Sequence, residues 1–310
     1  MAIYSCIGYP GSKRKCINLI MDTIPDGITD WREPFFGSGS VTLGFLQSPK
    51  SKDCKRFMVG DLAPEIWALW AGIQRDEKAV VDNVEKFWHE HIKSYDESLM
   101  YGIDPEVNKE LADRNRAEAD AFWKWTQTVD TTGMTLEERA ARTWLANRIS
   151  FSSMGDSGSM SYDNFRKFRL EHTQKILDMA PYLKRLEILN VPFTVTMKDV
   201  PEEGGFIFLD PPYMNQEKSG LYGKNGDTHH GFPHQEFADL CKATKAKWLV
   251  TYDDSIGVRK LFRGRGIYIK PFQITYTMAG KTADDALAGE ELFIANYDIV
   301  SKQSDLASIL

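Results

Sequence analysis

The sequence has few cysteines and no long apolar run, and each absence excludes a class of protein. Its 310 residues include four cysteines, with no C-x-x-C spacing and no histidine pair nearby, so we expect no zinc site and a reducing compartment. No segment reaches the length of a membrane-spanning helix, and the first residues contain no apolar signal core. We therefore expect a cytoplasmic protein that makes no contact with a membrane.

The chain also lacks an excess of positive charge. Its formal net charge of −6 argues against a general polyanion binder. The charge is segregated, however, because between Arg139 and Arg169 six basic residues stand against two acidic ones. A local basic surface is therefore compatible with the sequence. The length suits one large α/β domain, or one catalytic domain with a smaller insert.

Strand-like and helical segments are distributed unevenly along the chain. Short apolar segments near 28–31, 56–59, 205–209, 247–252, 266–277 and 291–297 predict strands. Residues 76–174 instead show helical spacing, including a capping box opened by Thr135 and a last helix from about 163 to 179. We expect an α/β catalytic domain formed by residues 1–75 and 175–310, interrupted by a mainly helical insert at 76–174.

The strongest chemical signal is FIFLDPPYM, residues 206–214, in which a buried strand ends at Asp210. Pro211 and Pro212 fix φ and lack backbone donors, so their carbonyls only accept hydrogen bonds. Asp210 and the Pro211 carbonyl beside the Tyr213 ring would suit a planar group bearing an NH2. The alternative is a proline turn with a capping acid. The carboxyl end of a parallel strand is, however, where α/β folds place their chemistry.

The second signal is EPFFGSGSV, residues 33–41, with a glycine turn between a strand and a helix. Gly37 and Gly39 permit close backbone approach. Thr42 stands where a dinucleotide-binding turn needs a third glycine, which argues against NAD. Asp61 follows Gly37 by 24 residues, near the spacing at which an acid binds ribose hydroxyls. Asp61 could also cap the following helix, and the two roles are compatible.

A third element, YPGSK at residues 9–13, is by itself only a turn and a helix start. In the order YPGSK, EPFFGSGS and DPPY, however, the chain resembles the Dam-type (D12 class, group alpha) DNA adenine-N6 methyltransferases. LANRISFSSMG and GEELFIANYD (residues 289–298) resemble further stretches of that family. Ser12 departs from the usual glycine, and Ser152-Ser153 replaces an asparagine-bearing stretch. The resemblance is thin between 76 and 144, so contacts to the target sequence cannot be carried over.

The resemblance implies a Rossmann-like fold that uses S-adenosylmethionine, with a helical recognition domain inserted, and a cytoplasmic location in a bacterium or a phage-infected cell. A flipped adenine of double-stranded DNA would be held by the motif Asp210, Pro211, Pro212 and Tyr213, without a metal. The cofactor would be held by Tyr9, Gly11, Lys13, Phe35, Gly37, Gly39, Asp61, Asp199, Val200 and Asp210. Phosphate contacts are expected from Arg148, Arg166, Lys167 and Arg169, although a solvated helix surface is the alternative for each.

Other functions remain compatible with parts of this pattern. D-P-P-Y also occurs in RNA guanine-N2 methyltransferases, and N-P-P-Y occurs in protein glutamine methyltransferases, but both lack the N-terminal element. Cytosine-N4 enzymes usually carry serine where Asp210 stands. A non-catalytic DNA-binding module is a further alternative. The recognition sequence, the oligomeric state and the biological role are not given by the sequence; restriction protection, phage self-protection and regulation all fit.

Overall fold

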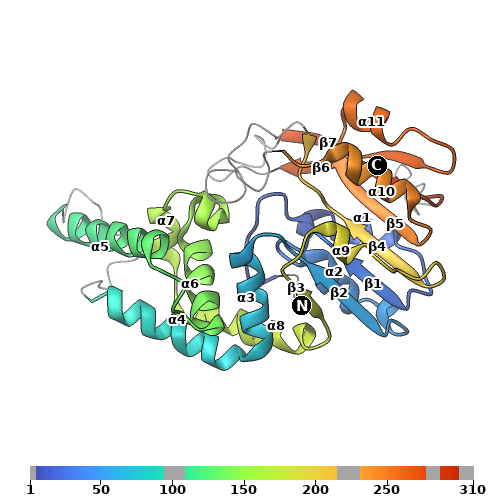
Figure 1. Cartoon of the computed structure of the whole chain (residues 1–310). Coiled ribbons are helices and arrows are strands. Elements are labelled where there is room, and N and C mark those ends of the chain that lie inside the picture. Colours follow the sequence, from blue (N-terminus) through green and yellow to red (C-terminus); the bar gives the residue numbers. More distant parts are fainter. Residues whose placement is uncertain (1–4, 94–108, 215–230, 277–286, 300–310) are drawn as a thin grey trace, which may run out of the picture.

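A seven-stranded sheet forms the centre of the computed structural model, which describes residues 5–93, 109–214, 231–276 and 287–299 (Figure 1). The strand order is β3-β2-β1-β4-β5-β7-β6. The first five strands are parallel, and β7 runs antiparallel between β5 and β6. The strands are β1 (Asp30–Glu33), β2 (Arg56–Gly60), β3 (Glu187–Leu189), β4 (Gly205–Leu209), β5 (Lys247–Asp253), β6 (Tyr268–Tyr276) and β7 (Leu287–Ala295).

Helices cover both faces of this sheet, and β4 shows why its sequence is apolar throughout. Phe206 and Phe208 belong to the core on one face, with α1 and α2, whereas Ile207 and Leu209 belong to the core on the other, with α10 and α11. A strand buried on both faces reads as a continuous apolar run.

The helices are α1 (Ile17–Thr23), α2 (Ser40–Leu46), α3 (Pro64–Arg75), α4 (Glu77–His91), α5 (Lys109–Thr128), α6 (Leu136–Ile149), α7 (Tyr162–Lys167), α8 (Gln174–Leu183), α9 (Phe193–Thr196), α10 (His234–Ala243) and α11 (Ile256–Leu261). The 3-10 turns are η1 (Lys13–Cys16), η2 (Pro49–Ser51), η4 (Phe151–Ser153), η5 (Gly155–Ser157) and η6 (Leu170–Thr173).

The strand order confirms the expected Rossmann-like α/β fold. On one side of β1 lie β2 and β3, and on the other side lie β4 and β5. Ligands bind to such sheets where the order reverses, outside the carboxyl ends of the strands. The first strand lies two residues later than expected, because the ladder begins at Asp30, whose amide donates to the Gly204 carbonyl. The short elements β3, α9 and α11 were not predicted.

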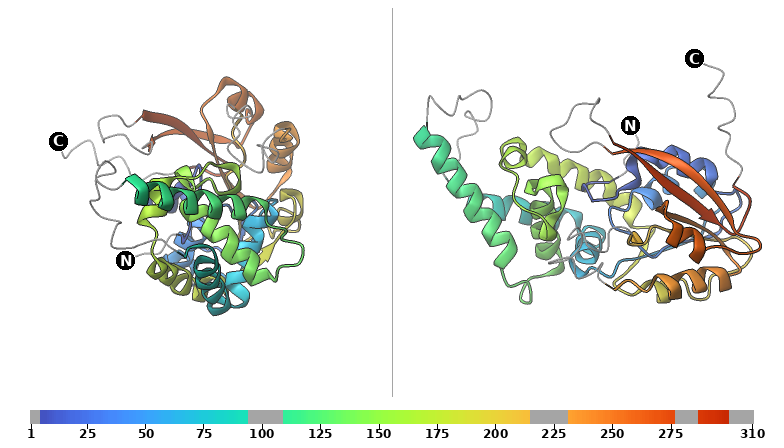
Figure 2. Two further views of the ribbon diagram at one scale, coloured as in Figure 1. Left: turned by 90° about the vertical axis from the view of Figure 1, so that its left-hand side faces the viewer. Right: turned by 90° about the horizontal axis from the view of Figure 1, so that it is seen from above.

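The helices α4 to α7 lie to one side of the sheet (Figures 1 and 2). Within residues 76–174, the described part is mainly helical, as expected. Its core is aromatic: the Trp88 ring lies 5.6 Å from Phe122, 5.3 Å from Phe165 and 4.5 Å from Phe168, between centroids. The capping box at Thr135 is present with both of its hydrogen bonds. No helix in the described ranges is both long and apolar enough to cross a membrane.

The helix expected over 163–179 is wrong in its continuity, because the structure divides it into α7, η6 and α8. Phe168 leaves the helical conformation, with ψ 141°, and buries its ring between Trp88 and Trp144. An apolar residue at Phe168 also continues the helical spacing, so the periodicity of the sequence cannot reveal this break.

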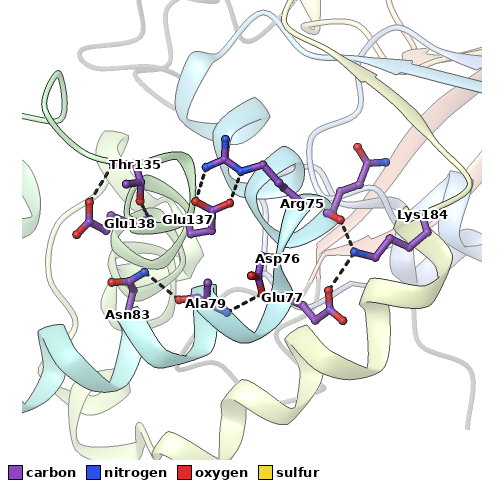
Figure 3. A network of polar contacts seen from close by, with 10 residues as sticks. Arg75, Asp76, Glu77, Ala79, Asn83, Thr135, Glu137, Glu138 and Lys184 are labelled. Carbon is purple, nitrogen blue, oxygen red and sulfur yellow. Dashed lines mark hydrogen bonds and ion pairs between the residues drawn. The ribbon is translucent and has the colours of Figure 1, made fainter.

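A polar network joins α3, α4, α6 and α8 (Figure 3). Arg75 on α3 forms a two-pronged ion pair with Glu137 on α6. Lys184, which follows α8, donates to the Gln74 carbonyl at 2.5 Å and to Glu77 at 3.1 Å. Asp76 accepts the amide of Ala79 at 2.9 Å and so caps α4. The Arg75 and Lys184 contacts join α3 and α8 to α6 and α4, each through a long cationic side chain that is partly exposed.

Candidate active site

A cavity of about 870 Å³ opens at the carboxyl ends of β1, β2 and β4. This volume is within the range of small-molecule sites. Its walls come from segments far apart in the sequence that the parallel sheet brings to one edge. The residues predicted from the sequence that line it are Tyr9, Gly11, Lys13, Phe35, Gly37, Asp61, Asp210, Pro211, Pro212 and Tyr213.

Lys13 and Asp210 form an ion pair in this cavity, in which the lysine is buried and the aspartate is 21% exposed. The Lys13 Nζ lies 2.7 Å from Asp210 Oδ2, and the lysine side chain is 3% exposed. Thr251 Oγ1 donates to Asp210 Oδ1 at 2.7 Å. Burial raises the pKa of Asp210, and the charge of Lys13 opposes that rise. Burial alone would lower the pKa of Lys13, but Asp210 and Glu291 outweigh it and raise that pKa above its ordinary value.

Tyr213 is held at its ring and at its hydroxyl. Its hydroxyl donates to Glu291 Oε2 at 2.8 Å, and Glu291 on β7 is 2% exposed. The Lys13 Nζ lies 5.1 Å from the centre of the Tyr213 ring, within the range of a cation–π contact. The aromatic ring of the DPPY motif is therefore fixed beside the Lys13–Asp210 pair.

Asp61, after β2, ties the glycine turn to the start of α3. Its carboxylate accepts the amides of Gly37 at 2.8 Å and Ala63 at 2.9 Å. Burial raises the pKa of Asp61 to about 6, against the effect of these two bonds. Gly37 has φ 45°, and a Cβ there would lie 3.0 Å from the Tyr9 ring, so glycine is required. Asp61 thus serves the turn while it faces the cavity.

Glu33, at the end of β1, is a buried acid that also lines the cavity. Its Oε2 accepts the Thr42 amide at 3.0 Å and the Thr42 hydroxyl, which in turn accepts from Trp31 Nε1 at 2.7 Å. Burial raises its pKa from the ordinary 4.5 to about 8. Glu33 begins the EPFF motif, but the glycines of that motif, and not the acid, carried the sequence signal.

Three of the predicted cofactor residues do not line the cavity. Gly39, with φ 67°, forms the N-cap of α2, and a Cβ there would lie 2.7 Å from the Phe36 ring. Asp199 lies beyond α9, and Val200 packs against the core on the α10 face. Part of the cavity wall is formed by a segment just before and within α9 that the sequence did not indicate. Its lining residues are Val191, Pro192, Phe193 and Thr194.

The predicted phosphate-contacting residues have different surroundings. Lys167 pairs with Asp163 at 2.5 Å, and the Arg169 guanidinium donates to the Arg166 and Phe168 carbonyls. Arg148 lies with its guanidinium carbon 5.9 Å from the Trp144 ring. The described residues contain no group of three or more His, Cys, Asp or Glu side chains that could hold a metal ion.

Two further cations lie near Arg148. Burial lowers the pKa of Lys175, and the charges of Arg148 and Arg14 lower it further. Arg14 directly follows the cavity residue Lys13. Arg14, Arg148 and Lys175 therefore form a basic cluster next to the cavity-lining N-terminal segment. None of the three forms an ion pair within the described part of the chain.

Comparison with known proteins gives a family match over most of the chain. A model of the D12 class N6 adenine-specific DNA methyltransferase family matches residues 9–277. Among solved structures, an rRNA methyltransferase, AviRa from Streptomyces viridochromogenes, aligns with 91% of this chain and 82% of its own, at 11% identity and a TM-score of 0.33.

Proposed function

Because the chain belongs to the D12 class of N6 adenine-specific DNA methyltransferases, we propose that it transfers a methyl group from S-adenosylmethionine to adenine N6 at a specific site in double-stranded DNA. One observation carries this proposal. The DPPY residues Asp210 and Tyr213 line the same cavity as the glycine turn at Gly37 and the acid Asp61. An amino-group pocket and a nucleoside pocket therefore share one space.

The lining residues fit an adenosyl cofactor. Asp61 faces the cavity beside the glycine turn and would accept the ribose hydroxyls. Leu62 is 60% exposed although it is apolar, and with Phe193 it supplies a wall for a nucleobase. Tyr9, Gly11, Lys13, Phe35 and Gly37 would line the rest, whereas Asp199 and Val200 have no support from the cavity. When bound, S-adenosylmethionine supplies an activated methyl group.

Asp210 and Pro211 would hold the amino group of the target base. A carboxylate has about four lone-pair sites, so Asp210 can accept from N6 while it keeps Lys13 and Thr251. With the Pro211 carbonyl accepting the second hydrogen, electron density stays on N6. Transfer would form the bond from N6 to the methyl carbon as the bond from that carbon to the sulfonium sulfur breaks, which leaves the demethylated thioether. N6 would then release one proton, for which Asp210 is the adjacent acceptor. Tyr213 offers its ring for stacking, which offsets part of the cost of flipping the base.

The basic cluster of Arg14, Arg148 and Lys175 would suit DNA phosphates, because the charges of the two arginines act on the lysine. Neighbouring cations repel one another, and a bound anion would relieve that repulsion. We place the DNA backbone there, rather than at Lys167, whose charge is engaged by Asp163. The helical region of residues 76–174 would read base edges, and residues 1–75 with 175–310 would form the catalytic domain.

Methylation of a sequence-diverse DNA with the purified protein, followed by mapping of N6-methyladenine, tests this function. We expect methylation at one short sequence, and a loss of roughly a hundredfold or more in rate for Asp210→Asn. Asp239→Asn, an exposed change on α10, is the matched control. Labelled methyl groups appearing in RNA or protein rather than DNA would contradict the proposal, as would full activity of Asp210→Asn.

A further inference from the structure

Glu291 is a buried carboxylate that none of the sequence motifs assigned to the site contains. It is 2% exposed and sits on β7 between two strands, in register with Asp253 on β5 and Phe272 on β6. Removing a carboxylate from water is costly unless partners compensate for it. Its partners include the Tyr213 hydroxyl at 2.8 Å, and its charge helps to raise the pKa of Lys13.

The register pair Asp253 and Glu291 holds the end of the DPPY motif at two points. Asp253 Oδ1 accepts the amide of Met214 at 3.0 Å, which fixes the backbone directly after Tyr213. Glu291 Oε2 accepts the hydroxyl at the far end of the Tyr213 side chain. Because β5 and β7 pair at this position, both acceptors belong to one rigid ladder. The Tyr213 ring is thus held on both sides, by the backbone that follows it and by its own hydroxyl.

We propose that Glu291 is a positioning residue for methyl transfer, which acts through the Tyr213 hydroxyl to fix the plane on which the target base stacks. This inference rests on the proposed function. A small misplacement of the reacting groups lowers the rate of transfer by roughly a hundredfold. A tyrosine ring without its anchor can turn about its side-chain bonds, so the target amino group would lose its alignment with Asp210.

Three variants separate the hydrogen bond from other roles of Glu291. Tyr213→Phe keeps the ring and removes the hydroxyl. Glu291→Ala removes the acceptor, and Glu291→Gln keeps an amide oxygen that can accept from Tyr213. We expect Tyr213→Phe and Glu291→Ala each to lower the single-turnover rate of methyl transfer to duplex DNA roughly ten- to a hundredfold. Glu291→Gln should recover most of that loss.

Two further measurements make the inference specific. The double variant Tyr213→Phe with Glu291→Ala should be no slower than the slower single variant, because both changes remove one bond. The dissociation constant for S-adenosylmethionine, measured by calorimetry, should stay within about twofold of wild type, since the bond acts on the base. Glu290→Ala is the matched control, because Glu290 is the exposed neighbour on the same strand and faces the opposite side.

The outcomes are distinct. A wild-type rate in Tyr213→Phe or Glu291→Ala, losses that multiply in the double variant, or equal loss in Glu291→Gln and Glu291→Ala would each overturn the inference. If Glu291→Ala does not fold, Tyr213→Phe decides, since it leaves the buried charges in place. Absence of N6-methyladenine in the product of the wild-type protein would instead overturn the proposed function itself.

Discussion

The cavity at the strand ends and the polar network of Figure 3 both contain ion pairs, but they treat charge in opposite ways. At the cavity Lys13 is 3% exposed, and Glu291, which accepts from the lining residue Tyr213, is 2% exposed. In the network the Arg75 side chain is 57% exposed and Lys184 is 48% exposed. Buried charges are costly to desolvate, whereas exposed pairs contribute little to stability. The difference indicates that the cavity keeps its charges for chemistry, and that the network only helps to attach two parts of the chain.

The largest effect should come from Glu33, the buried acid of the cavity. Its pKa is about 8 in the folded protein and 4.5 ordinarily. Between these values the folded protein holds a proton that the unfolded chain has lost, so stability falls as the pH rises and levels off above 8. The total fall is roughly 5 kcal/mol, at 1.36 kcal/mol for each pH unit.

Glu33→Gln removes this titration and keeps an acceptor for Thr42. We therefore expect its free energy of unfolding in denaturant to match wild type near pH 5 and to exceed it increasingly toward pH 8. Glu203→Gln, an exposed change before β4, should follow the wild-type curve. Parallel curves for wild type and Glu33→Gln would show that this acid is not held protonated.

Asp61 and Asp76 allow a direct comparison, because each accepts backbone amides near a helix start, one in the cavity and one in the network. Asp61→Ala would release the amides of Gly37 and Ala63 and loosen the turn. We expect binding of S-adenosylmethionine to weaken roughly ten- to a hundredfold, as for lost bonds to a charged group. Asp76→Ala should leave that dissociation constant unchanged and cost about 1 kcal/mol of stability as a lost helix cap. If both variants bind S-adenosylmethionine with the same dissociation constant, Asp61 supports only the glycine turn and does not contribute to cofactor binding.

Two exposed lysines test the same contrast on the DNA side. Lys175 lies near Arg14 and Arg148, whereas Lys167 forms an exposed ion pair with Asp163. Lys175→Ala should weaken DNA binding on all sequences and lower the dependence of log K on log salt by about 1. Lys167→Ala should change neither quantity. Fluorescence anisotropy at several salt concentrations measures both quantities. A larger effect of Lys167→Ala than of Lys175→Ala would indicate that DNA binds at the α7 surface instead.

The sequence predicted the site residues that lie together in short motifs, and it did not predict those that only the fold brings together. Gly37, Asp210 and Tyr213 lie in short motifs whose residue types state their chemistry, and all three line the cavity. Glu291 meets Tyr213 only because β7 lies beside β5, and hydrophobic patterns do not give that strand order. The family resemblance is confirmed by the match over residues 9–277.

The same limit explains the errors in the fold. The apolar run of β4 and the capping box at Thr135 are local signals, and both elements were predicted. The break at Phe168 depends on aromatic rings contributed by α4 and α6, so the local pattern does not contain it. The assignment of Val200 to the cofactor came from the family resemblance and stays a prediction. In the structure Phe193 lines the cavity, and Val200 is partly buried against the core on the α10 face.

The smallest effect is expected from the Arg75–Glu137 pair of the network. Both prongs of the pair are formed, and Glu137 is mostly buried by its surroundings, but the arginine is in contact with water. Solvent screening and the ordering of a long side chain then offset most of the attraction, which leaves a coupling of about 0.2–1 kcal/mol.

A double-mutant cycle of Arg75→Ala and Glu137→Ala, followed by denaturant unfolding, measures this coupling. It should shrink further at high salt, whereas coupling between Lys13 and Asp210 should not, because buried pairs are screened much less. A coupling above about 2 kcal/mol would exceed the range of exposed pairs and would remove the distinction between the two regions.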